Sequence, residues 1–540
     1  MKKLSLFLAV LLICMSAFVG CAKTKEGKNP VSVDIKGENA VEMSASGAFE
    51  SALNKEIEYI ENFDFENFTC SYDITLDAGE GLWELIEDLS GQAGVADIMN
   101  EVGLDNIAIC FDFMRNKNLF DISADALVNG TSIVDADVVF DADSKDGCLT
   151  IPALNEKAIG MNFAEVIDAL SEEVDFSKAI DAYMDYYYAV LDFYKKHNEK
   201  ELTGIVLSYL NTAKESIGEP SSSGTTEVNF GSFTKSLETD FYKIDQKDAF
   251  SVVLSLAKKL RNDDQVKALA GDFYGLFGTM NKYTEALGGV ALYDESDFDE
   301  TYDALMAELD NAISELEGEI ASVEADEELD FIIYYDNGKF CGIELSGEDE
   351  LSSVNFTCAY AEEGENIGFI FAGENVYSDG FEDASAVYFY GTKKDNVVDG
   401  IIAISADNYV YEIAVEDFVV NADGTGKGTV TIYGDTLYEF SAGEIPGNVG
   451  FRVVVDQPDL STTSVDLQLL NFSDVVLTLG IDVGLEEGSE NITLPESYVD
   501  ANSEEAQAWA QELVSNIPSL LNKLTEAGIS QDILGLVLNM

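Results

Sequence analysis

Few residues of this chain have the type and spacing that catalysis requires. Its only histidine, His197, follows Lys195 and Lys196 in a polar helical stretch. A nucleophile–histidine–acid triad needs an imidazole as its base, and this surrounding instead predicts an exposed helix residue. With 102 Asp and Glu residues, no carboxylate pair is singled out for acid–base hydrolysis. The sequence therefore assigns no catalytic residue.

Two loops carry oxygen and glycine patterns that resemble ligand sites. Gly424–Thr429 lacks the first glycine of a phosphate loop, and Gly428 stands where a hydroxyl residue should follow Lys427. In Asp141–Gly147, Lys145 occupies a calcium-ligand position and the glycine comes one place late. We expect both loops to be hairpin turns. The sequence therefore predicts no cofactor site and no metal site, only divalent cations held diffusely by an acidic surface.

The cysteines give a similarly negative result for zinc and for a disulfide framework. The sequence has no Cys-x-x-Cys spacing, which zinc sites commonly use. Cys14 lies in the predicted signal peptide and Cys21 is the predicted lipidation site, so five cysteines remain that could form disulfides. Five is an odd number, so at least one thiol must be free. The five are Cys70, Cys110, Cys148, Cys341 and Cys358.

The amino terminus has the pattern of an export signal followed by a lipid-attachment cysteine. Lys2 and Lys3 precede the apolar run 4–19, which is short for a permanent membrane span. The run ends in Ser-Ala-Phe-Val-Gly-Cys, which resembles a bacterial lipobox and makes Cys21 the predicted lipidation site. Two or more acyl chains on Cys21 would hold the protein stably at a membrane. We therefore expect an exported, lipid-anchored protein on the extracytoplasmic face of the cell membrane.

Charge narrows the classes of partner. The chain has 540 residues and a formal net charge of −72, which repels nucleic-acid phosphates, so we expect no nucleic-acid binding. Its hydrophobic fraction of 46% is nevertheless ample for a large core. The chain is thus expected to be folded and acidic.

Hydrophobic periodicity alternates between strand and helix along the chain. From 118 to 141, apolar residues alternate with Asp and Ser, which predicts strands with one apolar and one acidic face. The tyrosine-rich stretch 183–194 places Tyr183, Tyr187 and Tyr194 on one helical face, which favours core packing. The predicted fold class is α+β: a large antiparallel β meander, forming a curved sheet, packed against inserted and C-terminal helices. The predicted segments are a signal peptide (1–20), a tether (21–46), an N-terminal helix with antiparallel strands (47–155), a mostly helical insertion with a short β pair (156–326), a C-terminal meander (327–490) and C-terminal helices (491–540).

Several segments together carry a resemblance to a known group. Besides the signal and Cys21, they are IPALNEKAIGMN (151–162), AKKLRNDDQVKAL (257–269) and YYDNGKFCGIEL (334–345). With these the chain resembles large surface lipoproteins of unknown function from clostridial Gram-positive bacteria. The resemblance implies membrane attachment and broad architecture only, since none of these motifs is catalytic.

Two non-enzymatic hypotheses are favoured over a third, a carboxylate-dependent hydrolase. The first is a lipoprotein that binds a ligand, for example a hydrophobic molecule between sheet and helices, or that interacts with a surface protein. The alternative is a structural scaffold protein whose sheet face is a filled core. An open apolar space would favour the first hypothesis.

Overall fold

The computed structural model confirms an α+β fold with a large antiparallel meander. It describes residues 51–531 except 53, 57, 61, 165–175, 198, 287–288, 290–297, 323–327, 349–351, 378–381, 407–408, 442–444 and 490–491. Cys21 and the predicted tether lie outside the described residues. The chain divides into two compact units. Unit 1 comprises Ser171–Tyr411 with Met1–Asn54, and unit 2 comprises Lys55–Leu170 with Glu412–Met540.

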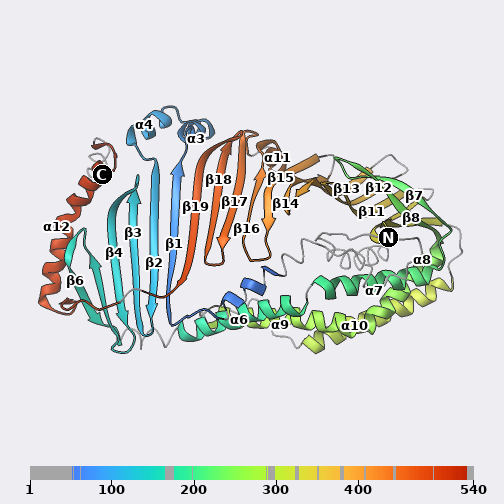
Figure 1. The fold of residues 1–540 in the computed structure, drawn as a ribbon, viewed down its shortest axis with the longest axis horizontal. Helices are drawn as coiled ribbons and strands as arrows, with labels where there is room; N and C mark the ends of the chain where they lie inside the picture. The colour runs from blue at the N-terminus through green and yellow to red at the C-terminus, as the bar shows by residue number, and fades with distance from the viewer. Residues whose placement is uncertain are drawn as a thin grey trace. The chain divides into compact units, whose positions relative to one another are not determined.

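Unit 2 is built on a broad sheet that joins the two parts of its sequence (Figure 1). Its central pair is β1 beside β19, where Ile74 lies opposite Ile481. Antiparallel neighbours extend from β1 through β2, β3, β4 and β5 to β6, and from β19 through β18, β17 and β16 to β15. Only the two-residue β20 is parallel, beside β6. The bounds are β1 (Asn67–Ala78), β2 (Asn106–Asn116), β3 (Leu119–Val128), β4 (Thr131–Asp141), β5 (Asp146–Ile151), β6 (Asn155–Asn162), β15 (Tyr409–Val420), β16 (Gly426–Ile432), β17 (Val449–Asp459), β18 (Thr462–Asn471), β19 (Asp474–Glu487) and β20 (Val499–Asp500).

The labelled helices of unit 2 lie at the ends and one edge of this sheet (Figure 1). α3 buries Leu82 and Leu85 against Val449 and Val476, which closes one end of β17 and β19. α12 packs along β6, β20 and β4, and the indole Nε1 of Trp509 donates a 2.7 Å hydrogen bond to the Lys157 carbonyl. The bounds are α3 (Leu82–Ser90), α4 (Val95–Val102), α11 (Gly434–Phe440) and α12 (Glu504–Glu526).

Unit 1 contains a second antiparallel meander in simple chain order, β7 to β14. This sheet coils, because Phe230 at the β7–β8 turn lies over β12: a Cβ added to Gly368 would stand 2.5 Å from the Phe230 Cβ. Phe230 is fully buried as a result. The bounds are β7 (Ser222–Asn229), β8 (Thr234–Asp245), β9 (Glu328–Asp336), β10 (Lys339–Glu348), β11 (Ser352–Glu363), β12 (Asn366–Tyr377), β13 (Glu382–Lys394) and β14 (Val397–Ala406).

The helices of unit 1 pack mainly on one another, and two of them reach the sheet. Leu210 and Ile217 of α7 and Ala249 of α8 cover a core that includes Ile333 and Leu345. α6 pairs with α9, α7 with α8, and α8 with α10. The bounds are α6 (Phe176–Lys196), α7 (Glu199–Ile217), α8 (Gln246–Arg261), α9 (Asp264–Ala286) and α10 (Phe298–Ile320).

The structure follows the predicted elements but groups them differently. The predicted division at residue 327 lies inside unit 1, and the first strands and last strands share one sheet in unit 2. A proline inside a helix removes a hydrogen bond and usually interrupts it, yet α12 continues through Pro518. Asn516 Nδ2 and Ser519 Oγ donate to the Leu154 and Ala153 carbonyls, so contacts with the β5–β6 turn hold the helix there.

Candidate functional site

Apart from Arg115 and Glu487, which lie opposite Phe68 at one end, one face of the unit 2 sheet carries no charged side chain across ten adjacent strands. In spatial order these are β5, β4, β3, β2, β1, β19, β18, β17, β16 and β15. Strand register places alternate residues of each strand on this face, and we name it the uncharged face. Residues that lie directly opposite one another on successive strands form rows across this face. The row through Ile74 is Val134, Ala126, Ile109, Ile74, Ile481, Val465, Val455 and Gly428, and the next is Val128, Ile107, Leu76, Leu479, Leu467, Val453, Val430 and Val415.

The uncharged face stays open to solvent instead of being covered by helices. Ten of its larger side chains are 38–45% exposed. This corrects the expectation that C-terminal helices cover the sheet face, because within unit 2 α12 contacts β4, β6 and β20 and α3 closes only one end. The exposed members are Tyr72, Ile74, Leu76, Ile109, Phe111, Ile122, Val138, Phe451, Val455 and Leu467.

A ladder of phenylalanines borders the uncharged face along one end of β1 to β4. Phe68, Phe113, Phe120 and Phe140 follow one another with ring centroids 5.6 to 6.4 Å apart. The guanidinium of Arg115 lies 5.5 Å from the centre of the Phe120 ring. This distance suits a cation–π contact, so the nearest cation at this border already has a partner.

The opposite face of the same sheet is acidic, as the alternation predicted. Asp73 lies directly opposite Asp482, and Asp125 directly opposite Asp135. Burial, with Asp137 and Asp112 nearby, raises the pKa of Asp121. Burial and Asp135 raise the pKa of Asp137 in the same way. Like charges across strands destabilise a sheet, so this face opposes folding at neutral pH.

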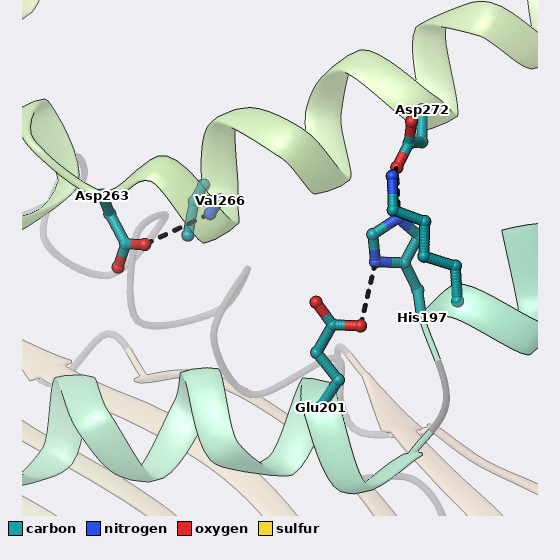
Figure 2. Close-up of polar contacts among 6 residues, drawn as sticks. His197, Glu201, Asp263, Val266 and Asp272 are labelled. Atoms are coloured by element: carbon teal, nitrogen blue, oxygen red, sulfur yellow. Dashed lines mark hydrogen bonds and ion pairs between the residues drawn. The ribbon is translucent and has the colours of Figure 1, made fainter.

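A second arrangement of titratable groups lies in the helical layer of unit 1 (Figure 2). His197 follows the last residue of α6, and its side chain is fully buried between Glu201 of α7 and Asp272 of α9. Its Nε2 lies 2.7 Å from Asp272 Oδ2, and its Nδ1 lies 3.3 Å from Glu201 Oε2. Lys196 also donates to Asp272. The prediction of an exposed histidine is therefore wrong.

The burial of His197 has a clear physical origin. Its backbone N–H still bonds to the Phe193 carbonyl, so the ring turns toward α9 at the end of α6. The Phe193 ring lies 4.9 Å from the imidazole and 5.9 Å from the Phe273 ring, which keeps water away. Tyr194, which the pattern placed in the core, is instead 49% exposed. The helix therefore turns Phe193 inward, while the Tyr183 side chain lies outside the described residues.

This cluster links helices and has no arrangement suited to catalysis or to a metal. The hydrogen bond from Lys196, then that from His197, holds the pKa of Asp272 below its usual range, so Asp272 is an ionised acceptor and Nε2 carries the hydrogen. The two ring nitrogens face different carboxylates, and their lone pairs and hydrogens do not converge on one point. No group of three or more metal-ligating side chains is found among the described residues.

The two remaining loops are turns, as the sequence predicted, and no disulfide forms among the described cysteines. Residues 421–425 form the β15–β16 turn, closed by a 2.8 Å bond from the Asn421 N–H to the Thr425 carbonyl. Residues 142–145 form the β4–β5 turn, where Asp141 Oδ1 accepts from the Asp143 N–H. All five cysteines carry free thiols: Cys70, Cys110, Cys148, Cys341 and Cys358.

Neither the described helices nor comparisons with known proteins assign the chain to a family. None of the helices that the structure describes has the length and apolar character needed to cross a bilayer. No family model, no curated protein and no solved structure matches the chain.

Proposed function

We propose that the chain is a membrane-anchored, extracytoplasmic lipoprotein that uses the uncharged face of unit 2 to bind the apolar surface of a partner. The observation that carries this proposal is a set of ten half-exposed apolar side chains on β1 to β4, β17 and β18 of an otherwise acidic protein. Soluble proteins rarely expose apolar patches larger than about 300–600 Å². A face ten strands wide spans about 43 Å at the usual strand spacing, and four rows extend about 20 Å along the strands. Its area is thus on the order of 800 Å², close to one side of a standard interface.

The openness of the face distinguishes a partner surface from a small ligand. Small-molecule sites are concave and bury most of the ligand. Ile74, Ile109 and Ile122 stand on one sheet face with solvent above them, and they belong to neighbouring strands. Such a surface gains most from another broad apolar surface. The scaffold alternative requires these residues to be a filled core, and their exposure argues against it.

A charge placed in the centre of the face tests this function. We would compare the chain from residue 22 onward with Ile74→Asp, and use Val514→Asp as the matched control, because Val514 is 63% exposed on α12 away from the face. The probes are the neutral dye Nile red and an uncharged amphipathic Gln/Leu helix. Binding of both should weaken about tenfold or more in Ile74→Asp and stay unchanged in Val514→Asp. Equal binding by all three proteins, or no binding to any, would refute the function.

The membrane anchor has its own test. Cys21→Ser should abolish incorporation of radiolabelled fatty acid and release the protein from the membrane fraction. Retention of the label in that variant would show that the attachment site is elsewhere.

A further inference from the structure

The charges that surround the uncharged face indicate what kind of partner it binds. Between Gly79 and Asp105, the segment that holds α3 and α4 contains seven acidic residues and no Lys, Arg or His. These helices lie at one end of β1 and β2, beside the face (Figure 1). The acidic residues are Glu80, Glu84, Glu87, Asp88, Asp97, Glu101 and Asp105.

The other end of the sheet is also mainly acidic. It holds the start of β1, the end of β19 and the β4–β5, β15–β16 and β17–β18 turns. The described strands and turns at this end hold four basic residues. Arg115 lies over Phe120, and Lys427 lies 3.5 Å from an Asp417 carboxylate oxygen. The other two are Lys145 in the β4–β5 turn and the exposed Lys117 in the β2–β3 turn. Seven carboxylates are exposed at this end: Asp64, Glu66, Asp143, Asp423, Asp459, Glu486 and Glu487.

We propose that the partner of the uncharged face is a cationic amphipathic polypeptide segment, whose apolar side packs on the face while its Lys and Arg residues lie over the acidic ends. This inference rests on the proposed function and names the partner's chemistry. The face itself has few polar groups to give specificity, because its backbone groups are used in the strand ladder and its side chains are apolar. Charge at the two ends is therefore what selects the partner and speeds its approach.

Charge also argues against the other occupants of such a face. A second copy of the chain would bring a further formal charge of −72 to the same interface. The surface of an anionic bilayer would meet the same repulsion within a screening length of about 8 Å. An amphipathic helix of 18 residues is about 27 Å long, so it fits within the estimated width of the face.

The test uses three 18-residue helical peptides with one leucine pattern and Lys, Gln or Glu at the polar positions. Titrated into the chain from residue 22 onward, the Lys/Leu peptide should bind about tenfold tighter than Gln/Leu, and Glu/Leu weaker again. Added salt should weaken the Lys/Leu peptide most. Ile74→Asp should reduce the affinity for Gln/Leu, whereas Val514→Asp should leave all three unchanged.

Two further variants separate the outcomes. Glu486→Gln with Glu487→Gln should weaken Lys/Leu binding about threefold and leave Gln/Leu binding unchanged. If all three peptides bind equally but Ile74→Asp weakens them, the function stands and the charge inference is overturned. If no peptide binds, the function itself fails. A dimer in analytical ultracentrifugation that Ile74→Asp dissociates would overturn the inference in favour of a second copy.

Discussion

The buried His197 cluster permits a quantitative test of how the helical layer is held together. Replacing Asp272 by Ala removes the acceptor 2.7 Å from His197 Nε2 and leaves a fully buried ring nitrogen without that partner. A buried donor left unpaired costs about 1–3 kcal/mol, so we expect Asp272→Ala to lower the free energy of unfolding of unit 1 by that amount at pH 7. The matched control is Glu317→Ala, which breaks the pair with Lys258, where both side chains are about half exposed. That pair should contribute at most about 0.5 kcal/mol.

The sign of the pH dependence follows from the lowered pKa of Asp272. Hydrogen bonds from Lys196 and His197 lower it, so its stabilising contribution is present above the unfolded pKa of about 4. The contribution is lost as the pH falls through the lower folded pKa. The difference between the natural protein and Asp272→Ala should therefore persist from pH 7 to 5 and shrink toward pH 2.

The measurement can separate the two units within the full chain. Both tryptophans, Trp83 and Trp509, belong to unit 2, so their fluorescence follows that unit during urea unfolding. Circular dichroism at 222 nm follows mainly unit 1, because its helices α6 to α10 contain most of the helical residues that the structure describes, and the smaller contribution of α12 changes with the fluorescence. Asp272→Ala should shift the dichroism transition and leave the fluorescence midpoint unchanged. A shift no larger than that of Glu317→Ala, or one that is constant from pH 7 to pH 2, would refute the reasoning.

Three further changes test other parts of the structure. Asp121→Asn should stabilise unit 2 by roughly 0.5–1 kcal/mol at pH 7, because the raised pKa of Asp121 makes its ionisation unfavourable in the fold. The gain, measured as the fluorescence midpoint in urea, should disappear below about pH 4, where Asp121 is protonated in the unfolded chain as well. No gain at pH 7 would contradict this prediction. Leu237→Ala should cost unit 1 about 2–5 kcal/mol in urea unfolding, since this side chain is fully buried, and a loss under about 1 kcal/mol would count against that packing. Burial raises the pKa of the Cys358 thiol to about 12, and burial with the neighbouring Asp73 raises the pKa of the Cys110 thiol to about 11. Both thiols should therefore react slowly with an alkylating reagent at pH 8, as measured by mass spectrometry. Rapid labelling of either cysteine would contradict the prediction.

Local sequence patterns predicted most of the secondary structure. The Asn337-Gly338 pair forms the β9–β10 turn with positive φ at both residues. Alternation placed Phe120, Ile122 and Ala124 on one face and Asp121 and Asp125 on the other, and the register confirms it. These features depend on residues close together in the chain, so the sequence expresses them directly.

The two regions that matter most for function were not predictable in the same way. His197 follows two lysines, and only the approach of α9 with Asp272 and Phe273 makes its position buried. An apolar strand face looks the same in sequence whether a helix covers it or solvent does. The exposure of Ile74 and Leu76 is known only once α12 is seen to pack elsewhere.

The sequence alone determined the segregation of apolar and acidic side chains on alternating faces, because a strand's period of two is a property of neighbouring residues. It also determined the excess of negative charge. The tertiary structure alone decided that β1 lies beside β19, with Thr75 opposite Gly480, and so joined apolar stripes from both parts of unit 2 into one face. Pairing between strands some 400 residues apart depends on how the whole chain packs, which no local pattern contains.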